Sequence, residues 1–374
     1  MRFIRRAIVL LLIAGLLYFI YADDYRQAGL SGVWTEVKQD VHDIATSKFV
    51  QTSINYIGNS VDYIIGLFSD QPEEAEEIPN VPAPSLDEPT EQSFSIHNIE
   101  INDSKQDVEA ELDKADRVTA NEYHTEWHTY HDHYQNFLMI AYDDNNQVSG
   151  LYTNQDLLRS KEGITLQDSK QEVRDTYGEP IDAIQKGLVR YQINNDQEQD
   201  TFQLDGNYVT FFYDEHQDTQ VAAVQIISEE MEQQKEKFFG EPSETLAEGF
   251  EYQLFDLTNA ARVKFDQPVL EWYEPAQPTA QHHSQDMADQ NYFSHNNLDG
   301  ETPFDRLEAD GISFRMAGEN LAAGQPSSIY AHQGLMNSEG HRNNILHSDF
   351  RQMAVGVAFR EDGQPFYTEA YLTQ

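Results

Sequence analysis

Two histidines and one acidic residue in the last third of the chain have the types and spacing of a chemical site: His295, Glu319 and His341. Two neutral imidazoles and a carboxylate suit zinc, and a water molecule on that ion could act as a nucleophile. Without a metal, Glu319 could orient an imidazole for acid–base work, and Ser338 could supply the nucleophile. A structural role, in which Glu319 and Asn320 tie loops together, stays open beside these.

The sequence around these residues contains six motifs in a fixed order. They are Asn-Ala-Ala-Arg at 259–262, Val-Leu-Glu-Trp at 269–272, His-Ser-Gln-Asp-Met at 283–287, Tyr-Phe-Ser-His at 292–295, Gly-Glu-Asn-Leu at 318–321, and Met-Asn-Ser at 336–338 running into His-Arg-Asn-Asn-Ile-Leu at 341–346. Together they resemble the CAP superfamily (cysteine-rich secretory, antigen 5 and pathogenesis-related proteins) in its bacterial form. The resemblance covers about a third of the chain. It implies an α-β-α sandwich with an open cleft, in which two histidines and two acidic residues often hold a divalent cation.

The resemblance places a divalent cation, with zinc best suited, on three residues of this sequence: His295, Glu319 and His341. The family's fourth ligand is an acid on the helix before the second histidine, and its place falls nearest Ser338. Glu339, one residue further on, could replace that acid if its side chain turned inward. The additional candidates for the cleft are therefore Ser338, Glu339 and Asn320.

Local signals predict the elements that position these residues. Apolar spacing indicates helices at about 250–261, 275–291 and 326–337. Thr302, followed by Pro303 and Asp305, forms the capping box of a further helix, which ends at Asp310-Gly311. Alternating apolar and polar residues at 353–359 and 365–372 predict a hairpin about Asp362-Gly363.

Three polar residues on the first two of these helices are expected to be structural. His283 shares a face with apolar residues and is interpreted as a packed core histidine. Asn259 and Arg262 lie on the face opposite the apolar stripe, where they would support a loop. Helices alternating with a few strands and closing on a hairpin are compatible with a three-layer sandwich over residues 248–374.

Residues 93–238 contain an internal duplication. The stretch 101–108 is echoed by 166–173, and the apolar strand and acidic turn at 137–144 are echoed at 208–215. Each copy predicts a strand, a capped short helix and two strands around an acidic turn, so the copies should pack as a pseudo-symmetric α+β pair. This part resembles the module that commonly precedes bacterial CAP domains, which implies no catalytic residue. The histidines at 124, 128, 131 and 133 are interpreted as part of a solvated strand or loop, not a metal site.

The N-terminal part predicts export and attachment to the cell membrane. Three arginines precede an uncharged run at 7–22, and two aspartates follow it, so residues 1–22 are a single-pass signal anchor or a removed signal peptide. The remainder would be extracellular, or secreted if the segment is cleaved. Residues 23–68 have the apolar stripe of an amphipathic helical stalk, whose self-association is left open, and 69–92 form an acidic, Pro-rich linker.

Composition excludes several classes of function. The chain has 24 Lys and Arg against 65 Asp and Glu, a net charge of −41, which argues against nucleic acid or anionic lipid as a partner. It has no cysteine, so disulfides, cysteine nucleophiles and Cys-bound zinc are excluded.

The predicted fold class is α+β: a C-terminal three-layer α-β-α sandwich, preceded by the duplicated α+β domain and an N-terminal anchor helix. The first functional hypothesis is an extracellular, membrane-anchored binding or cell-envelope module, with a divalent-cation-binding cleft for a lipid, glycan or peptide. The alternatives are a metal-dependent hydrolase acting on a peptide or cell-wall substrate, and a scaffold or signalling protein working through the duplicated domain. A buried acid with a shifted pKa against a histidine would favour catalysis.

Overall fold

A computed structural model describes residues 64–66, 79–193 and 198–374 of the chain. The predicted anchor, nearly all of the predicted stalk and the first part of the linker lie outside these residues. Within the described ranges no helix is both long enough and apolar enough to cross a membrane. The second part of the linker, from residue 79, packs on the duplicated domain, where the Glu100 carboxylate accepts hydrogen bonds from the backbone N–H groups of Thr90, Glu91 and Gln92.

One short segment of the predicted stalk is described, and the helix expected there is wrong. Strand β1 (Ile64–Gly66) pairs antiparallel with β14 (Met316–Ala323), with Ile64 opposite Gly318. Apolar periodicity over a few residues cannot reveal such pairing. The backbone N–H and C=O groups at a sheet edge can pair with an extended segment whatever its side chains are.

The duplicated domain is built on one seven-stranded antiparallel sheet, in the order β10-β11-β12-β6-β5-β4-β3. Its strands are β3 (Arg117–Ala120), β4 (Glu126–Asp132), β5 (Gln135–Tyr142), β6 (Val148–Thr153), β10 (Gln199–Leu204), β11 (Asn207–Asp214) and β12 (Gln220–Ser228). The two copies meet at the β6–β12 seam, so that β4, β5 and β6 mirror β10, β11 and β12. The predicted pseudo-symmetric pair is confirmed.

Each copy also contributes one short helix, as the sequence predicts. Helix α4 (Lys105–Leu112) begins at the N-cap Ser104, and α5 (Lys170–Tyr177) begins at Ser169 with a complete capping box from Glu172. Smaller elements complete the domain: the β2–β7 pair (Phe94–Ile96 with Leu158–Ser160), the β8–β9 hairpin (Ala183–Lys186 with Val189–Gln192) and α6 (Glu229–Gln234).

The histidine tract of this domain is only partly solvated. His124 and His133 are exposed and have positive φ angles of 63° and 50°, whereas His128 is buried in β4, where its ring and that of Tyr142 make an edge-to-face contact. Burial lowers the pKa of His128 to about 4. The expectation of a solvated element is therefore wrong at His128, because both faces of this sheet pack against a hydrophobic cluster.

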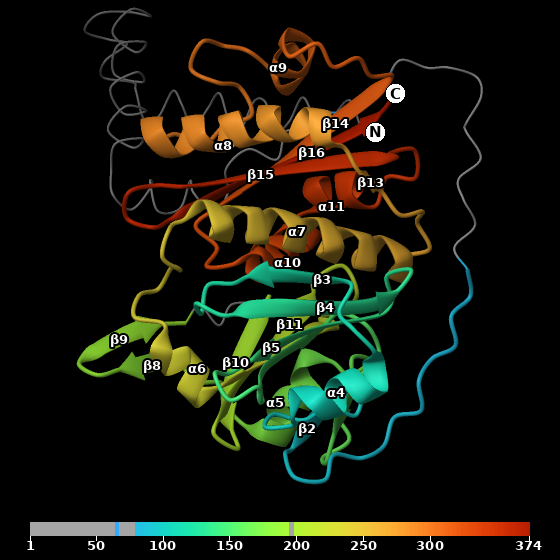
Figure 1. The fold of residues 1–374 in the computed structure, drawn as a ribbon, viewed down its shortest axis with the longest axis vertical. Coiled ribbons are helices and arrows are strands. Elements are labelled where there is room, and N and C mark those ends of the chain that lie inside the picture. The colour runs from blue at the N-terminus through green and yellow to red at the C-terminus, as the bar shows by residue number, and fades with distance from the viewer. Residues whose placement is uncertain (1–63, 67–78, 194–197) are drawn as a thin grey trace, which may run out of the picture. The chain divides into compact units, whose positions relative to one another are not determined.

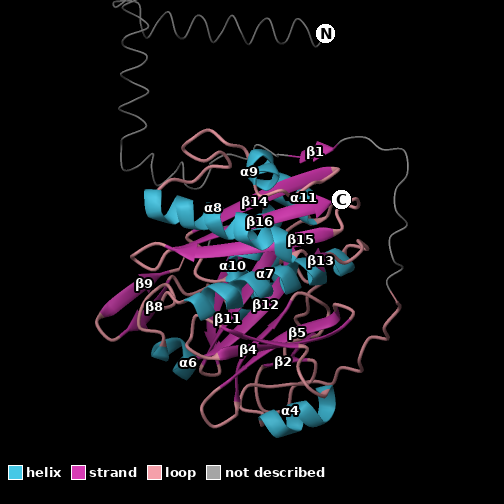
Figure 2. Cartoon of the chain, turned by 45° about the horizontal axis from the view of Figure 1, so that its top comes forward, coloured by secondary structure: helices cyan, strands magenta, loops and turns pink. Residues whose placement is uncertain are grey.

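The C-terminal domain is a three-layer sandwich around a sheet in the order β1-β14-β16-β15-β13, in which β13 (Glu271–Trp272) pairs parallel with β15 (Gln352–Phe359). The predicted hairpin is β15 followed by β16 (Pro365–Thr373). Helices α8 (Gln277–Gln290) and α9 (Pro303–Ala309) pack on one face of the sheet. The other face packs against α7 (Glu244–Lys264), α10 (Ser328–Asn337) and α11 (Glu339–Ile345), and the layers are visible in Figures 1 and 2.

Helices α7 and α10 lie between the two sheets and belong to both domains (Figure 1). Leu257, Ala260 and Ile329 on these helices pack into one cluster with Trp127 and other side chains of the duplicated domain. A Cβ atom added at Gly249 of α7 would lie 2.3 Å from the Ala120 carbonyl oxygen of β3, so only glycine permits this approach. Helix α7 begins at Glu244, four residues before the expected domain start at 248, and the two domains share a core.

Candidate functional site

Strand β14 divides the predicted site between the two faces of the sheet. Side chains alternate along a strand, so Glu319 lies on the α8–α9 face with Ala317 and Leu321, while Asn320 lies on the α7–α10 face with Ala322. Each of the two polar residues has its own hydrogen-bond network.

On the α8–α9 face, His295, Glu319 and Arg306 form a triad. His295 Nδ1 lies 2.8 Å from Glu319 Oε1, and Arg306 Nη2 donates to Glu319 Oε2 at 2.7 Å. The three side chains are only 7%, 5% and 10% exposed. Arg306 Nη1 also donates to the backbone oxygen of His295 at 2.8 Å. The carboxylate thus orients the imidazole, and the guanidinium balances the buried negative charge.

The end of helix α8 and a buried histidine position the loop that carries His295. Helix α8 ends at Gln290, and the left-handed backbone of its C-cap Asn291 (φ 52°, ψ 51°) turns the chain toward His295. His283 is buried in the core as expected, and its Nε2 lies 3.0 Å from the Ser294 backbone oxygen. Burial lowers the pKa of His283 to about 4, so the ring is neutral at physiological pH.

The predicted capping box is confirmed at the start of α9. Thr302 Oγ1 accepts from the Asp305 N–H at 3.2 Å, and Asp305 Oδ2 accepts from the Thr302 N–H at 2.8 Å. The capped turn fixes the position of Arg306, the next residue in the helix.

On the opposite face, Asn320 links strand β14 to β16 and to helix α11. Asn320 Nδ2 donates to Glu369 Oε2 at 3.0 Å and to the His341 backbone oxygen at 3.2 Å, while Asn344 Nδ2 donates to Asn320 Oδ1 at 2.9 Å. The Tyr371 hydroxyl donates to Glu369 Oε2 at 2.6 Å. Glu369 is fully buried, and burial raises its pKa to about 7.

The remaining candidates of the sequence analysis all lie at the start of α11. His341 is half-buried and meets Asn320 through its backbone. Ser338 is the N-cap of this helix, and its backbone oxygen accepts from the Arg342 N–H at 2.8 Å. Glu339 is the first helical residue and is exposed to solvent. The structure therefore joins His295 directly to Glu319, and connects His341 to the neighbouring Asn320.

Sequence reasoning missed two charged residues of these networks. Arg306 follows the capping box in a chain with few basic residues, and only a search for a cation that could balance Glu319 would have singled it out. Glu369 lies between Tyr367 and Tyr371 at the period-two spacing of one strand face, and all three are buried. That spacing is the signal that the acid points inward with the tyrosines.

The donor types at this site suit a cation, but their arrangement does not. Both oxygens of Glu319 are already engaged, one by His295 and one by Arg306. A divalent ion on this carboxylate would lie beside the buried guanidinium, and the two positive charges would repel each other. In residues 64–66, 79–193 and 198–374, no group of three or more His, Asp or Glu side chains is arranged to hold a metal ion. Cation binding by His295, Glu319 and His341 stays a prediction.

Arg306 gives that prediction a sharp test. A zinc ion on Glu319 must displace the Arg306 guanidinium, so Arg306→Gln should raise zinc affinity about tenfold or more. His295→Ala should remove most of the affinity, because it deletes one of two nitrogen ligands. Calorimetric titration of the full chain with zinc measures both, and His282→Ala on the exposed side of α8 is the control. Unchanged zinc binding in His295→Ala would show that the predicted ligand set is wrong.

Comparison with known proteins agrees with this architecture. Residues 101–238 match the family model of the CAP-associated N-terminal domain, and residues 255–371 match that of the cysteine-rich secretory protein family.

Two Bacillus subtilis proteins are similar in sequence. The uncharacterized membrane protein YlbC is 40% identical over 122 residues, 33% of this chain and 34% of the relative. The uncharacterized protein YkwD is 39% identical over 123 residues, 33% of this chain and 47% of the relative. The matches thus span between a third and a half of the relatives' length.

Two crystal structures share the fold across both domains. An extracellular protein containing a SCP domain from Bacillus anthracis has a TM-score of 0.64 and 24% identity, over 80% of this chain and 100% of that one. A cysteine-rich secretory protein from Staphylococcus aureus has a TM-score of 0.56 and 14% identity, over 73% of this chain and 91% of that one. The ordered motifs and the two family matches agree: residues 255–371 form a CAP domain of the cysteine-rich secretory protein family, and it follows a CAP-associated N-terminal domain at residues 101–238.

Proposed function

We propose that this chain is an extracellular, membrane-anchored module that binds a component of the cell envelope (a lipid, a glycan or a peptide) at the surface around His295 and His341. The observation that carries this proposal is the triad of His295, Glu319 and Arg306. The buried carboxylate already holds the His295 imidazole in one orientation, so a ligand that reaches its small exposed part, 7% of the side chain, meets a fixed polar group.

The titrating acids of the C-terminal domain support binding over hydrolysis. Burial raises the pKa of Glu251 and Glu369 to about 7 and that of Asp256 to about 6. Their hydrogen-bond partners are amides, tyrosines and an arginine: Gln277 and the Val357 N–H for Glu251, Asn320 and Tyr371 for Glu369, and Arg117 and Tyr134 for Asp256. A general acid or base working with a histidine would place such a carboxyl against an imidazole.

The sequence and two similar proteins support the cellular location. The basic start, the uncharged run at 7–22 and the acidic residues after it have the order of a segment that leaves its C-terminal side outside the cell. One relative is named a membrane protein, and one structural neighbour is described as extracellular.

Co-sedimentation of the full chain tests the proposal and separates the ligand classes. The probes are purified peptidoglycan sacculi in one arm and neutral-lipid vesicles in the other, with His295→Gln and His282→Gln as matched variants. His282 is exposed on α8 and outside the triad. We expect His295→Gln to lose most of the binding to one probe and His282→Gln to bind as wild type does. Equal binding by wild type and His295→Gln in both arms would refute the proposal.

A further inference from the structure

The duplicated domain holds the turn between α10 and α11 through polar contacts. Asn337, the last residue of α10, donates from Nδ2 to the Tyr213 backbone oxygen at 2.9 Å and accepts at Oδ1 from the Glu215 N–H at 3.0 Å. Its backbone oxygen lies 2.9 Å from His216 Nε2. Residues 213–216 form the end of β11 and the turn before β12, and we call them the docking turn.

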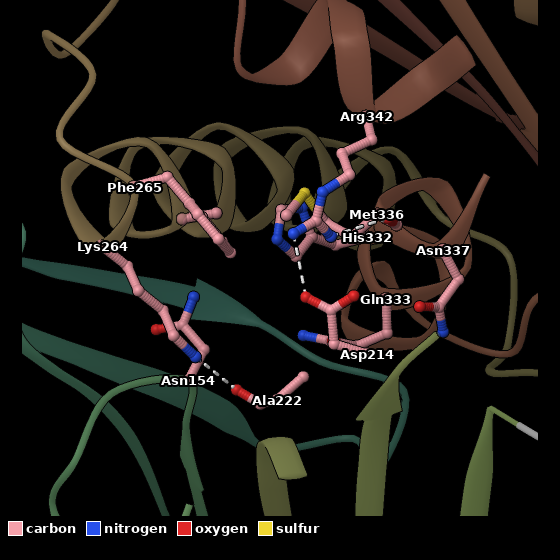
Figure 3. Close-up of a pocket in the computed structure, with 11 residues that line it drawn as sticks. Asn154, Asp214, Ala222, Lys264, Phe265, His332, Gln333, Met336, Asn337 and Arg342 are labelled. Atoms are coloured by element: carbon pink, nitrogen blue, oxygen red, sulfur yellow. Dashed lines mark hydrogen bonds and ion pairs between the residues drawn. The ribbon is translucent and has the colours of Figure 1, made fainter. Parts of the chain in front are cut away.

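Arg342 makes the strongest of these contacts, one residue from His341. Its Nη2 donates to Asp214 Oδ2 at 2.9 Å, and the two side chains are only 12% and 8% exposed. Its Nη1 donates to the Met336 backbone oxygen at 3.1 Å, and its guanidinium lies 4.7 Å from the centre of the Phe265 ring. A partly buried ion pair with these added bonds is far more specific in geometry than a surface pair. Figure 3 shows Arg342 reaching down from its helix to Asp214.

The contact between the domains at this point is incompletely filled. Beside the ion pair lies a cavity of about 20 Å³, which has room for one water molecule (Figure 3). Asn154 and His332 line it, and the buried Asn154 Oδ1 and His332 Nδ1 have no hydrogen-bond partner. The apolar packing of Ile345 and the bond from Arg262 hold the C-terminal end of α11, while the Asp214 and Asn337 bonds hold its N-terminal end.

The other copy of the duplication supplies a natural comparison. Asp143 occupies the position in the first copy that Asp214 occupies in the second. Both carboxylates close their own turn: Asp143 Oδ1 accepts from the Asn145 N–H at 2.8 Å, and Asp214 Oδ1 accepts from the His216 N–H at 2.8 Å. The second oxygen of Asp143 accepts from Asn145 within the same turn, whereas that of Asp214 accepts from Arg342. Only in the second copy does this carboxylate contact the C-terminal domain.

We propose that the CAP-associated domain positions His341, and that Asp214 is its positioning residue. The docking turn holds Arg342 and Asn337, and through them it fixes helix α11, a seven-residue element that carries His341 and meets Asn320. The ligand surface is therefore completed by a domain that contributes no side chain to the triad. This inference rests on the proposed function only for its consequence on ligand binding; the coupling between the docking turn and α11 stands without it.

Hydrogen–deuterium exchange on the full chain tests the coupling without any ligand. We expect Asp214→Asn to speed exchange of the amides at 342–346 about tenfold or more, while those of α9 (Pro303–Ala309) exchange at the wild-type rate. Asp143→Asn, the matched change in the first copy, should alter neither helix. At a fixed pH, the ring resonances of His341 should shift in Asp214→Asn and those of His295 should not, a signature that a general loss of stability would not give.

Two results would overturn the proposal. One is wild-type exchange of α11 in Asp214→Asn, and the other is equal acceleration of α11 by Asp143→Asn. If Asp214→Asn speeds exchange in α9 as well, Asn337→Ala is the second variant, and it must loosen α11 alone for the proposal to stand. The sacculus and vesicle probes separate the two claims: a wild-type chain that binds neither refutes the proposed function, while the exchange result decides the positioning role.

Discussion

At pH 8, replacement of Glu369 by glutamine is expected to raise the free energy of unfolding by about 3 kcal/mol. Burial raises the pKa of this carboxyl from 4.5 to about 7, so the folded chain holds its proton more tightly than the unfolded chain. The favourable contribution is complete below the unfolded pKa and is lost as pH rises through the folded pKa. About 2.5 pKa units correspond to roughly 3 kcal/mol. Glutamine keeps the shape and can accept the same two bonds from Asn320 and Tyr371, without a charge.

Urea unfolding of both proteins at pH 4 and pH 8 measures this effect. The two stabilities should nearly coincide at pH 4, where the wild-type carboxyl is mostly neutral in both states, and should separate as pH rises. Other buried acids, such as Glu251 and Asp256, contribute equally to both chains, so their effects cancel in the difference. Glu361→Gln, at an exposed position beyond the end of β15, is the control and should leave the pH dependence unchanged. If the two proteins differ in free energy of unfolding by the same amount at both pH values, ionisation of the buried Glu369 carboxyl does not limit stability.

Arg262→Met is expected to lower the free energy of unfolding by about 3–5 kcal/mol. The Arg262 guanidinium is fully buried and donates to three backbone oxygens, those of Ile345 and His347 at 2.7 and 2.9 Å and that of Pro268 at 2.7 Å. Methionine fills much of the volume but leaves these carbonyls without donors, at about 1–3 kcal/mol each and not fully additive. Burial lowers the pKa of Arg262 to about 10, so the side chain stays charged at physiological pH.

Thermal unfolding of the full chain measures this loss, and the same change at a surface arginine is its control. Arg360 pairs with Asp362 at the surface, where the two side chains are 31% and 56% exposed, so Arg360→Met should cost no more than about 1 kcal/mol. A stability of Arg262→Met equal to that of Arg360→Met would show that the loop after α11 does not depend on the buried guanidinium.

The sequence predicted local elements well where a few neighbouring residues decide the structure. The Thr302–Asp305 capping box begins α9, Asp362-Gly363 closes the β15–β16 hairpin, and the repeated Ser caps at 104 and 169 mark equivalent helices. Asn259 and Arg262 were also predicted to support a loop, and Asn259 exchanges two hydrogen bonds with the Leu270 backbone. Each of these signals lies within a few residues of its effect.

Long-range contacts could not be predicted in the same way. The pairing of Ile64–Gly66 with β14, the ion pair between Arg342 and Asp214, and the link from Arg306 to Glu319 join residues that are distant in sequence. Strand β16 is buried on both faces, so alternation along it could show that Glu369 shares a face with Tyr367 and Tyr371 but not which helices cover that face. The start of the C-terminal domain could not be placed from the sequence either. Helices α7 and α10 pack against both sheets, so buried residues lie on both of their faces and the apolar pattern shows no domain boundary.

The central claim is that this site binds an envelope component without transforming it. Analysis of the products released from sacculi that carry the bound chain tests this claim. The full chain is incubated with purified peptidoglycan, with and without added zinc, and the soluble fraction is followed over time for new reducing ends and new amino groups. A binding module leaves both signals at the level of a buffer control while the chain remains bound to the pellet. A steady release of soluble fragments by the wild-type chain, lost in His295→Gln and retained in His282→Gln, would contradict this account and establish a hydrolase.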